Sequence, residues 1–224
     1  FRLECCGFAP VLMSRLVWLI PLFPLVGAVV NALLRRVIGH KAHWLAVPAV
    51  LVSFLISCAV FNRVWHGETW TGDLFPWVVA EPFHTAVTAQ VDQLTAVMLL
   101  VVTGVGFLIH VYSVGYMHGD GGYARFFTYM NLFVFSMVML VLAGNFLVLY
   151  VFWEAVGLCS YLLIGFWYEK QSASDAGKKA FIVNRVGDFG FGLGIMLIWV
   201  TFGTLTYTEV FAKADTSVSG GVYL

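Results

Sequence analysis

Three charged side chains lie inside long apolar stretches of the sequence. They are the residues there that could bind ions or carry protons. Glu154 is the only formal charge in residues 145–168 and lies near their middle, while Arg185 and Asp188 lie within residues 179–202. A charge at the centre of a bilayer costs about 2.5–3.5 kcal/mol on insertion scales, so such residues usually mark ion or proton routes. We therefore treat all three as candidate site residues.

Glu154 has no charged neighbour on its own helix. The residues three and four positions away are Tyr150, Val151, Gly157 and Leu158. Its partner must therefore come from another helix or from water. A carboxylate whose protonation depends on a nearby cation is what a proton relay requires, and we favour that role. The alternative is a structural carboxyl group that hydrogen-bonds across helices.

Arg185 and Asp188 are three residues apart in "FIVNRVGDFGF". On a helix this spacing places both side chains on one face, within reach of each other. We expect them to form a buried pair. The spacing leaves open whether that pair only makes the helix insertable or belongs to a proton path, because buried ion pairs arise with and without function.

The composition indicates an integral membrane protein. The 224 residues are 61% hydrophobic and 11% charged, whereas soluble domains are about a quarter charged. The net charge is zero, and nothing suggests a nucleic-acid partner. No CxxC, HExxH, GxGxxG or Walker-type motif occurs, so we expect no cofactor and no metal site in the chain itself. The cysteines suggest neither a disulfide framework nor a metal site; they are Cys5, Cys6, Cys58 and Cys159.

Apolar runs of about 20 residues predict an all-α membrane protein with six transmembrane helices. The predicted spans are residues 16–34, 43–61, 92–112, 126–143, 145–168 and 179–202. Alternating stretches in residues 62–91 predict a small β-hairpin, and residues 113–125 and 169–177 are read as loops. Residues 1–12 are interpreted as a non-native or upstream extension, because Met13 begins a typical membrane-protein start. Residues 13–224 then form the transmembrane domain.

Two polar residues at the ends of the third span have expected local roles. Asp92 precedes the span and is expected to cap the N-terminus of that helix. His110 lies close to the opposite end, and we interpret it as a residue at the membrane interface.

The distribution of charge predicts the orientation. The side with loops 35–42, 113–125 and 169–178 carries seven basic residues, namely Arg35, Arg36, Lys41, Arg125, Lys170, Lys178 and Lys179, and the other side carries four. The positive-inside rule places these loops in the cytoplasm and the N-terminus outside. We expect the membrane to be the inner membrane of a bacterium.

Two stretches carry a family resemblance. "GNFLVLYVFWEAVGLCSYLLIGFWYEKQSASDAGKKAFIVNRVGDFGFGLGIMLIW" and "VDQLTAVMLLVVTGVGFLIHVYSVGYMHGDGGYARFFTYMNLFVFSMVMLVLAGN" resemble the antiporter-like subunits of respiratory complex I, of the subunit L or ND-five type. The resemblance extends from Met13 onward. It implies a bundle of inverted helical repeats, of which this sequence is an N-terminal fragment.

The resemblance also implies roles for the three charged residues. The glutamate of the family's fifth helix falls on Glu154 and pairs with a lysine of the seventh helix, which would lie past residue 224. The family's "RVGD" places its sixth-helix charges on Arg185 and Asp188. Glu154 is then the switchable half of a proton-pumping pair.

The expected function is proton translocation by a membrane subunit of NADH:quinone oxidoreductase, also called complex I. The partners implied are the other membrane-arm subunits, the lipid bilayer and protons, while NADH, FMN, Fe–S clusters and quinone are bound by partner subunits. A subunit of a multisubunit Na⁺/H⁺ antiporter or a related ion-coupled transporter is the alternative. A third possibility is a structural segment whose buried charges merely pair.

Overall fold

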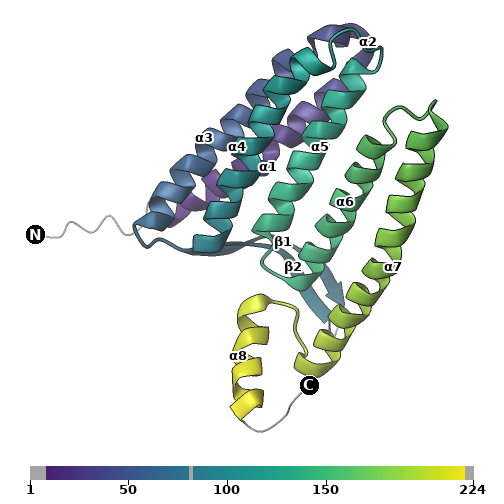
Figure 1. Ribbon diagram of the computed structural model, residues 1–224. Helices are drawn as coiled ribbons and strands as arrows, with labels where there is room; N and C mark the ends of the chain where they lie inside the picture. The colour runs from purple at the N-terminus through teal and green to yellow at the C-terminus, as the bar shows by residue number, and fades with distance from the viewer. Residues whose placement is uncertain (1–8, 81–82, 220–224) are drawn as a thin grey trace, which may run out of the picture.

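The computed structural model describes residues 9–80 and 83–219, which form mainly long helices (Figure 1). Six of the described helices are long and apolar enough to cross a membrane, by length and composition. They are α1 (Ala9–Leu33), α3 (His43–Trp65), α4 (Gln93–Tyr116), α5 (Tyr123–Leu142), α6 (Phe146–Ile164) and α7 (Gln171–Phe202). The predicted helical membrane fold with six spans is confirmed.

Shorter elements join or follow the spans. The helix α2 (Arg35–Ile38) and a 3-10 turn (Gly39–Lys41) connect α1 to α3, and α8 (Tyr207–Ser219) follows α7. The predicted hairpin is confirmed as the antiparallel strands β1 (Trp70–Ala80) and β2 (Phe83–Val91). Its register shifts on both sides of Pro76, because proline has no N–H to give to the ladder.

Helix ends differ most from the prediction around residues 165–178. We expected a polar loop over residues 169–177, but α7 already begins at Gln171. The Gln171 amide donates to both carboxylate oxygens of Asp175 at 2.9 and 3.0 Å, and Lys178 lies 3.8 Å from Asp175. These contacts over three and four residues stabilise a helix beyond its apolar part, so hydropathy alone placed the start too late.

At the N-terminus, the structure reaches only part of the expected extension. The helix α1 begins at Ala9, so it includes residues 9–12 of that segment. The rest of the segment, residues 1–8, lies outside the described residues. The cap predicted for the third span is confirmed, because the Asp92 side chain accepts a hydrogen bond of 2.8 Å from the Thr95 backbone N–H.

The spans form two parts that meet at α5. The helices α1, α3, α4 and α5 pack as a four-helix unit, and α6 and α7 extend from α5 as a row (Figure 1). The core of the four-helix unit contains buried Val17, Ile20, Val50, Val60, Leu99, Val134, Val138 and Leu142. In contrast, α7 exposes large apolar side chains along its length, including Val186, Phe189, Met196 and Val200. Such a surface suits lipid or further protein.

The hairpin supports the joint between α5 and α6. The Gly144 N–H donates to the Thr88 carbonyl at 2.9 Å, and a Cβ on Gly144 would approach Thr88 to 2.8 Å, so only glycine fits. The Asn145 side chain caps α6 by accepting from the Val148 N–H at 2.7 Å, and its amide donates to the Ala86 carbonyl at 2.8 Å. One buried side chain therefore ties the start of α6 to β2.

We predict that Asn145→Ala lowers the free energy of unfolding by about 1–3 kcal/mol, because it removes a helix cap and leaves buried backbone groups without partners. Unfolding of the chain in mixed detergent micelles by increasing SDS measures the change. The matched control is Asn62→Ala, an exposed position on α3, which we expect to alter stability little. An equal effect of both substitutions would contradict the assigned role of Asn145.

Candidate functional site

The antiparallel pair α6 and α7 carries all three candidate residues, and aromatic contacts fix its register. Near the basic end of the helices, the rings of Tyr161 and Phe181 lie 5.3 Å apart. Toward the other end, the rings of Tyr150 and Phe191 lie 5.7 Å apart. Between these contacts the middle of α6 faces the middle of α7, which brings Glu154 opposite Arg185.

Glu154 and Arg185 form an ion pair between the two helices. The sequence left two partners open for Glu154, another helix or water, and the structure shows the first, on a helix of this chain. The Arg185 guanidinium carbon also lies 4.7 Å from the centre of the Phe181 ring, in a cation–π contact. The Glu154 side chain is 19% exposed and that of Arg185 is 45% exposed. The pair is thus accessible from the side of Arg185.

Asp188 does not pair with Arg185, so that prediction was wrong. Its carboxylate instead accepts a 2.8 Å hydrogen bond from the indole Nε1 of Trp153, the neighbour of Glu154. If Arg185 had paired with Asp188, the Glu154 charge would have no partner among the described residues. The observed arrangement gives each carboxylate its own donor, which lowers the cost of burying charge.

An open groove beside Arg185 is the feature that makes a switch feasible. It has a volume of about 370 Å³ and is lined by Phe181, Ile182, Arg185, Val186 and Phe189 of α7. Apart from the guanidinium this lining is apolar, so Arg185 is the residue there that a charged or polar group could bind. Chemically, the site can hold a carboxylate charged while a cation is near and allow it to be protonated when the cation moves away.

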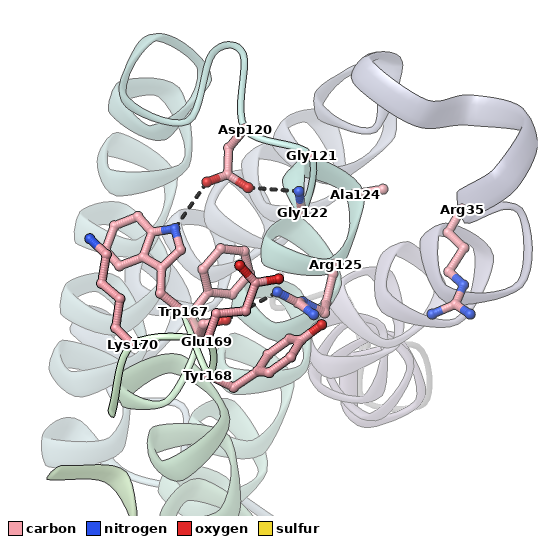
Figure 2. A pocket seen from close by; sticks show the side chains of 11 residues that line it. Arg35, Asp120, Gly121, Gly122, Ala124, Arg125, Trp167, Tyr168, Glu169 and Lys170 are labelled. Carbon is pink, nitrogen blue, oxygen red and sulfur yellow. Dashed lines mark hydrogen bonds between the residues drawn. The ribbon is translucent and has the colours of Figure 1, made fainter. Parts of the chain in front are cut away.

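A second pocket lies at the basic end, between the start of α5 and the segment after α6 (Figure 2). Asp120 accepts hydrogen bonds from the Trp167 indole at 3.0 Å and from the Gly122 N–H at 2.6 Å. Arg125 donates to the Phe166 carbonyl at 3.0 Å and lies over the rings of Phe166 and Tyr168. These contacts join the end of α6 to α5. We call the set Asp120, Arg125, Phe166, Trp167 and Tyr168 the basic-end clamp.

Two family models match the chain. The model described as "NADH-Ubiquinone oxidoreductase (complex I), chain 5 N-terminus" matches residues 77–127, and "NADH:quinone oxidoreductase/Mrp antiporter, TM" matches residues 143–222. The second match contains Glu154, Arg185 and Asp188. The NADH-quinone oxidoreductase subunit L of Mycobacterium tuberculosis is 44% identical over 87% of this chain and 31% of its own length.

The chain belongs to the antiporter-like membrane subunits of the complex I chain 5 type.

Other members of this family are equally similar. Subunit L of Rickettsia typhi is 44% identical over 90% of this chain and 31% of its own length. The NAD(P)H-quinone oxidoreductase subunit 5 of the Paulinella chromatophora chromatophore is 44% identical over 92% of this chain and 32% of its own length. The chain thus spans about a third of the curated relatives that it matches.

Solved structures show the same fold at lower identity. A membrane-bound sulfane sulfur reductase complex from an archaeon matches with a TM-score of 0.76 and 19% identity, over 87% of this chain and 39% of that one. The Mrp complex of Dietzia matches with a TM-score of 0.72 and 24% identity, over 87% of this chain and 20% of that one. The helix arrangement is therefore that of antiporter-like membrane complexes.

Two side chains outside the Glu154–Arg185 pair have surroundings that the sequence analysis did not predict. His110 is completely buried, with its ring 6.1 Å from that of Phe127, so it packs between helices, and its position at the membrane interface stays a prediction. That interpretation used only the position of His110 along α4, whereas burial depends on the face that it turns to α5. Asp120 was missed as a structural residue. The signal was its position two residues before Gly122, since aspartate often accepts from the N–H two residues on.

We predict that Glu154 and Arg185 are energetically coupled in a double-mutant cycle. Glu154→Gln and Arg185→Met each lower stability, and the double variant loses about 1 kcal/mol less than the sum, a modest value because Arg185 is partly exposed. SDS-induced unfolding of the four proteins gives the coupling energy. The control cycle, Arg185→Met with Asp188→Asn, should be nearly additive. Strong coupling there and none with Glu154 would contradict the pairing.

We also predict that the basic-end clamp weakens in acid. The hydrogen bond from Trp167, followed by the Gly122 N–H and the charge of Arg125, holds the pKa of Asp120 below its ordinary value of 3.8, although desolvation opposes this. A carboxyl with a lowered folded pKa stabilises the folded state above its ordinary pKa, and this stabilisation disappears as pH falls through the folded pKa.

The fluorescence of Trp167 in membranes, followed from pH 7 down past 3.8, measures this loss. Asp120→Asn should remove the pH dependence that belongs to this residue. The matched control is Asp175→Asn, near the start of α7. If Asp120→Asn leaves the acid transition where it was, the clamp does not depend on the Asp120 charge.

Proposed function

We propose that this chain is part of a proton-translocating membrane subunit of an NADH:quinone oxidoreductase, and that Glu154 is its proton-carrying group. The observation that supports this most directly is the Glu154–Arg185 ion pair, which joins two spans at mid-membrane and is open on the Arg185 side. The 44% identity to curated NADH-quinone oxidoreductase subunits supports the choice of complex.

The proposed mechanism is electrostatic. With Arg185 near, the carboxylate of Glu154 is kept charged; when Arg185 moves away, an isolated carboxylate is costly and takes up a proton. Return of the guanidinium drives that proton onward. Asp188 stays with Trp153, so it offers Arg185 a nearby anion one turn along α7 for the moments when Glu154 is protonated.

A second cation completes the proposed switch. In the resemblance noted above, the partner of Glu154 is a lysine on a later helix, beyond residue 224. The groove lined by Phe181, Arg185 and Phe189 is a route by which such a lysine can approach the pair. Its arrival would repel Arg185, and a charge change at a neighbouring subunit would thereby reach Glu154 without movement of α6.

The remaining parts of the energy conversion belong to partner subunits in this proposal. NADH, FMN, Fe–S clusters and quinone are bound there, and the other membrane-arm subunits pass the conformational change to this one. The chain lies in a bacterial inner membrane, with the clamp end and its Arg35, Arg125 and Lys170 in the cytoplasm.

A Na⁺/H⁺ antiporter subunit is the second candidate. It is supported by the Mrp part of the second family model and by the fold match to the Mrp complex. The sequence identity to that complex is 24%, against 44% to subunit L proteins. Co-purification of the complete subunit with redox subunits or with Mrp-type subunits decides between the two.

We predict that Glu154→Gln in the complete subunit, assembled in its complex, lowers proton translocation by about 10²-fold while assembly falls much less. A neutral amide keeps the shape of glutamate and cannot carry a proton. The measurement is quinone-dependent acidification of inverted membrane vesicles, normalised to assembled complex. Glu169→Gln, an exposed acidic position after α6, is the control. Equal losses of assembly and transport for Glu154→Gln would reject the relay role.

A further inference from the structure

Among the completely buried polar side chains of the four-helix unit, three have hydrogen-bonding atoms without a partner in the part of the chain that the structure describes. They are Asn31 of α1, His110 of α4 and Asn131 of α5, all 0% exposed. The unpartnered atoms are Oδ1 of Asn31, Nε2 of His110 and both amide atoms of Asn131. A buried polar group without a partner costs about 1–3 kcal/mol, so this set needs an explanation.

Contacts between the helices place the three residues at one level of the unit. Gly106 of α4 lies against Val134 of α5, since a Cβ on Gly106 would be 3.3 Å from a Val134 methyl group. One turn further along α4, the His110 ring lies 6.1 Å from that of Phe127. Because α4 and α5 run antiparallel, Asn131 lies between these two contacts and on the same face of α5.

The helix α1 completes the group. A Cβ on Gly27 would be 3.2 Å from the amide nitrogen of Asn131, so the two helices are in close contact there. Asn31 is one turn further along α1, on the same face. Its own amide nitrogen donates to the Ala42 carbonyl at 3.4 Å, while its oxygen has no partner among the described residues.

Other buried polar residues of the same unit are satisfied in a different way. Their hydroxyl groups donate to backbone carbonyls, as Ser57 does to Ser53 at 2.8 Å and Thr103 does to Leu99 at 2.6 Å. Hydroxyl groups can reach the carbonyl one turn back on their own helix. The Asn131 amide makes no such bond. Asn31 and His110 each bond to one backbone carbonyl, those of Ala42 and Gly106, but their remaining polar atoms, like the Asn131 amide, have no partner among the described residues.

The chemistry of the unpartnered atoms selects the ligand. Asn131 offers a donor and an acceptor, and Asn31 offers an acceptor. His110 Nδ1 donates to the Gly106 carbonyl at 2.7 Å, so Nε2 of the neutral ring is an acceptor. A cation cannot satisfy the amide N–H, and an anion cannot satisfy the two amide oxygens. A water molecule both donates and accepts, and buried waters typically make about three hydrogen bonds to such groups.

We propose that Asn31, His110 and Asn131 form a binding site for ordered water inside the α1–α3–α4–α5 unit. The site lies where Asn131 of α5 meets Gly27 of α1, whereas Glu154 pairs with Arg185 between α6 and α7. It is thus separate from the Glu154–Arg185 pair. Water here joins three helices that otherwise contact through apolar side chains, and the inference does not depend on the proposed proton transport.

The direct test is a cryo-EM map of the complete subunit in its assembled complex, at a resolution that shows ordered water. The expected result is a density peak within hydrogen-bond distance of the Asn131 amide and of His110 Nε2. The proposal is overturned if that space is empty, or if Asn131 bonds directly to Asn31 or His110. This readout needs no turnover, so it is independent of the Glu154→Gln experiment.

A substitution gives a second test, in which the thermal midpoint changes in opposite directions with and without bound water. Asn131→Leu keeps nearly the same shape and removes the amide. If the amide holds water, the variant leaves His110 and the water short of partners, and we expect the thermal midpoint to fall by about 2–4 °C with loss of the density peak. If the amide has no partner, leucine removes a penalty and the midpoint is unchanged or higher, which would overturn the proposal.

The matched control is Ser57→Ala. It removes a buried hydroxyl of the same unit that the Ser53 carbonyl already satisfies, and the density at Asn131 should stay. If Asn131→Leu does not assemble, the wild-type map still decides, and His110→Gln, which retains a polar end near the same place, should keep the peak. Loss of the peak in Ser57→Ala would show that the density is not held by the three named residues.

Discussion

A charge inside a bilayer must find its partner within the protein, and the Glu154–Arg185 ion pair is where this chain meets that constraint. The two helices that provide the pair share one register, fixed by the ring contacts of Tyr161 with Phe181 and of Tyr150 with Phe191. A shift of one residue along either helix would turn one charge toward lipid. The pair therefore sets the alignment of α6 and α7, and the aromatic contacts maintain it.

The division of the chain into two parts follows from where polar groups are satisfied. In the four-helix unit, hydroxyl groups bond mainly to backbone carbonyls, as Ser57 and Thr103 do within their own helices and Ser53 does to Ile20 of α1. Close approach of these helices is possible at Gly27 and Gly106. The α6–α7 pair joins its helices through charged side chains, and α7 leaves most of its other face exposed. The first part is a scaffold and the second carries the site.

The sequence predicted features that depend on one helix at a time. Hydropathy located the spans, the alternation of apolar and polar residues located the β-hairpin, and Asp92 predicted the cap of α4. Each of these signals is local in the sequence. The pairing of Arg185 was mispredicted because two anions compete for it: Asp188 three residues away on α7, and Glu154 on α6. The spacing within α7 indicates Asp188 as a partner. Glu154 can be identified as a partner only when the register of α6 against α7 is known.

The same limit explains the other differences. His110 was assigned from its depth along α4, whereas its burial comes from the face that meets Phe127. The start of α7 was assigned from the end of its apolar run, but polar contacts of Asp175 extend the helix further. The clamp between Asp120 and Trp167 joins residues 47 positions apart. No periodicity within either segment contains that contact.

The ends of α6 determine which member of the ion pair can move. At one end Asn145 ties the helix to β2, and at the other Arg125 and Asp120 bind the residues that follow Ile164. The helix is thus held at both ends, and Glu154 at its centre has little freedom beyond its own side chain. Arg185 lies on a helix with one packed face, has a longer side chain and borders the open groove. In the proposed mechanism, the member of the pair that moves is therefore Arg185, and the carboxylate of Glu154 stays in place. The cation–π contact with Phe181 gives the guanidinium a defined place to rest while it does so.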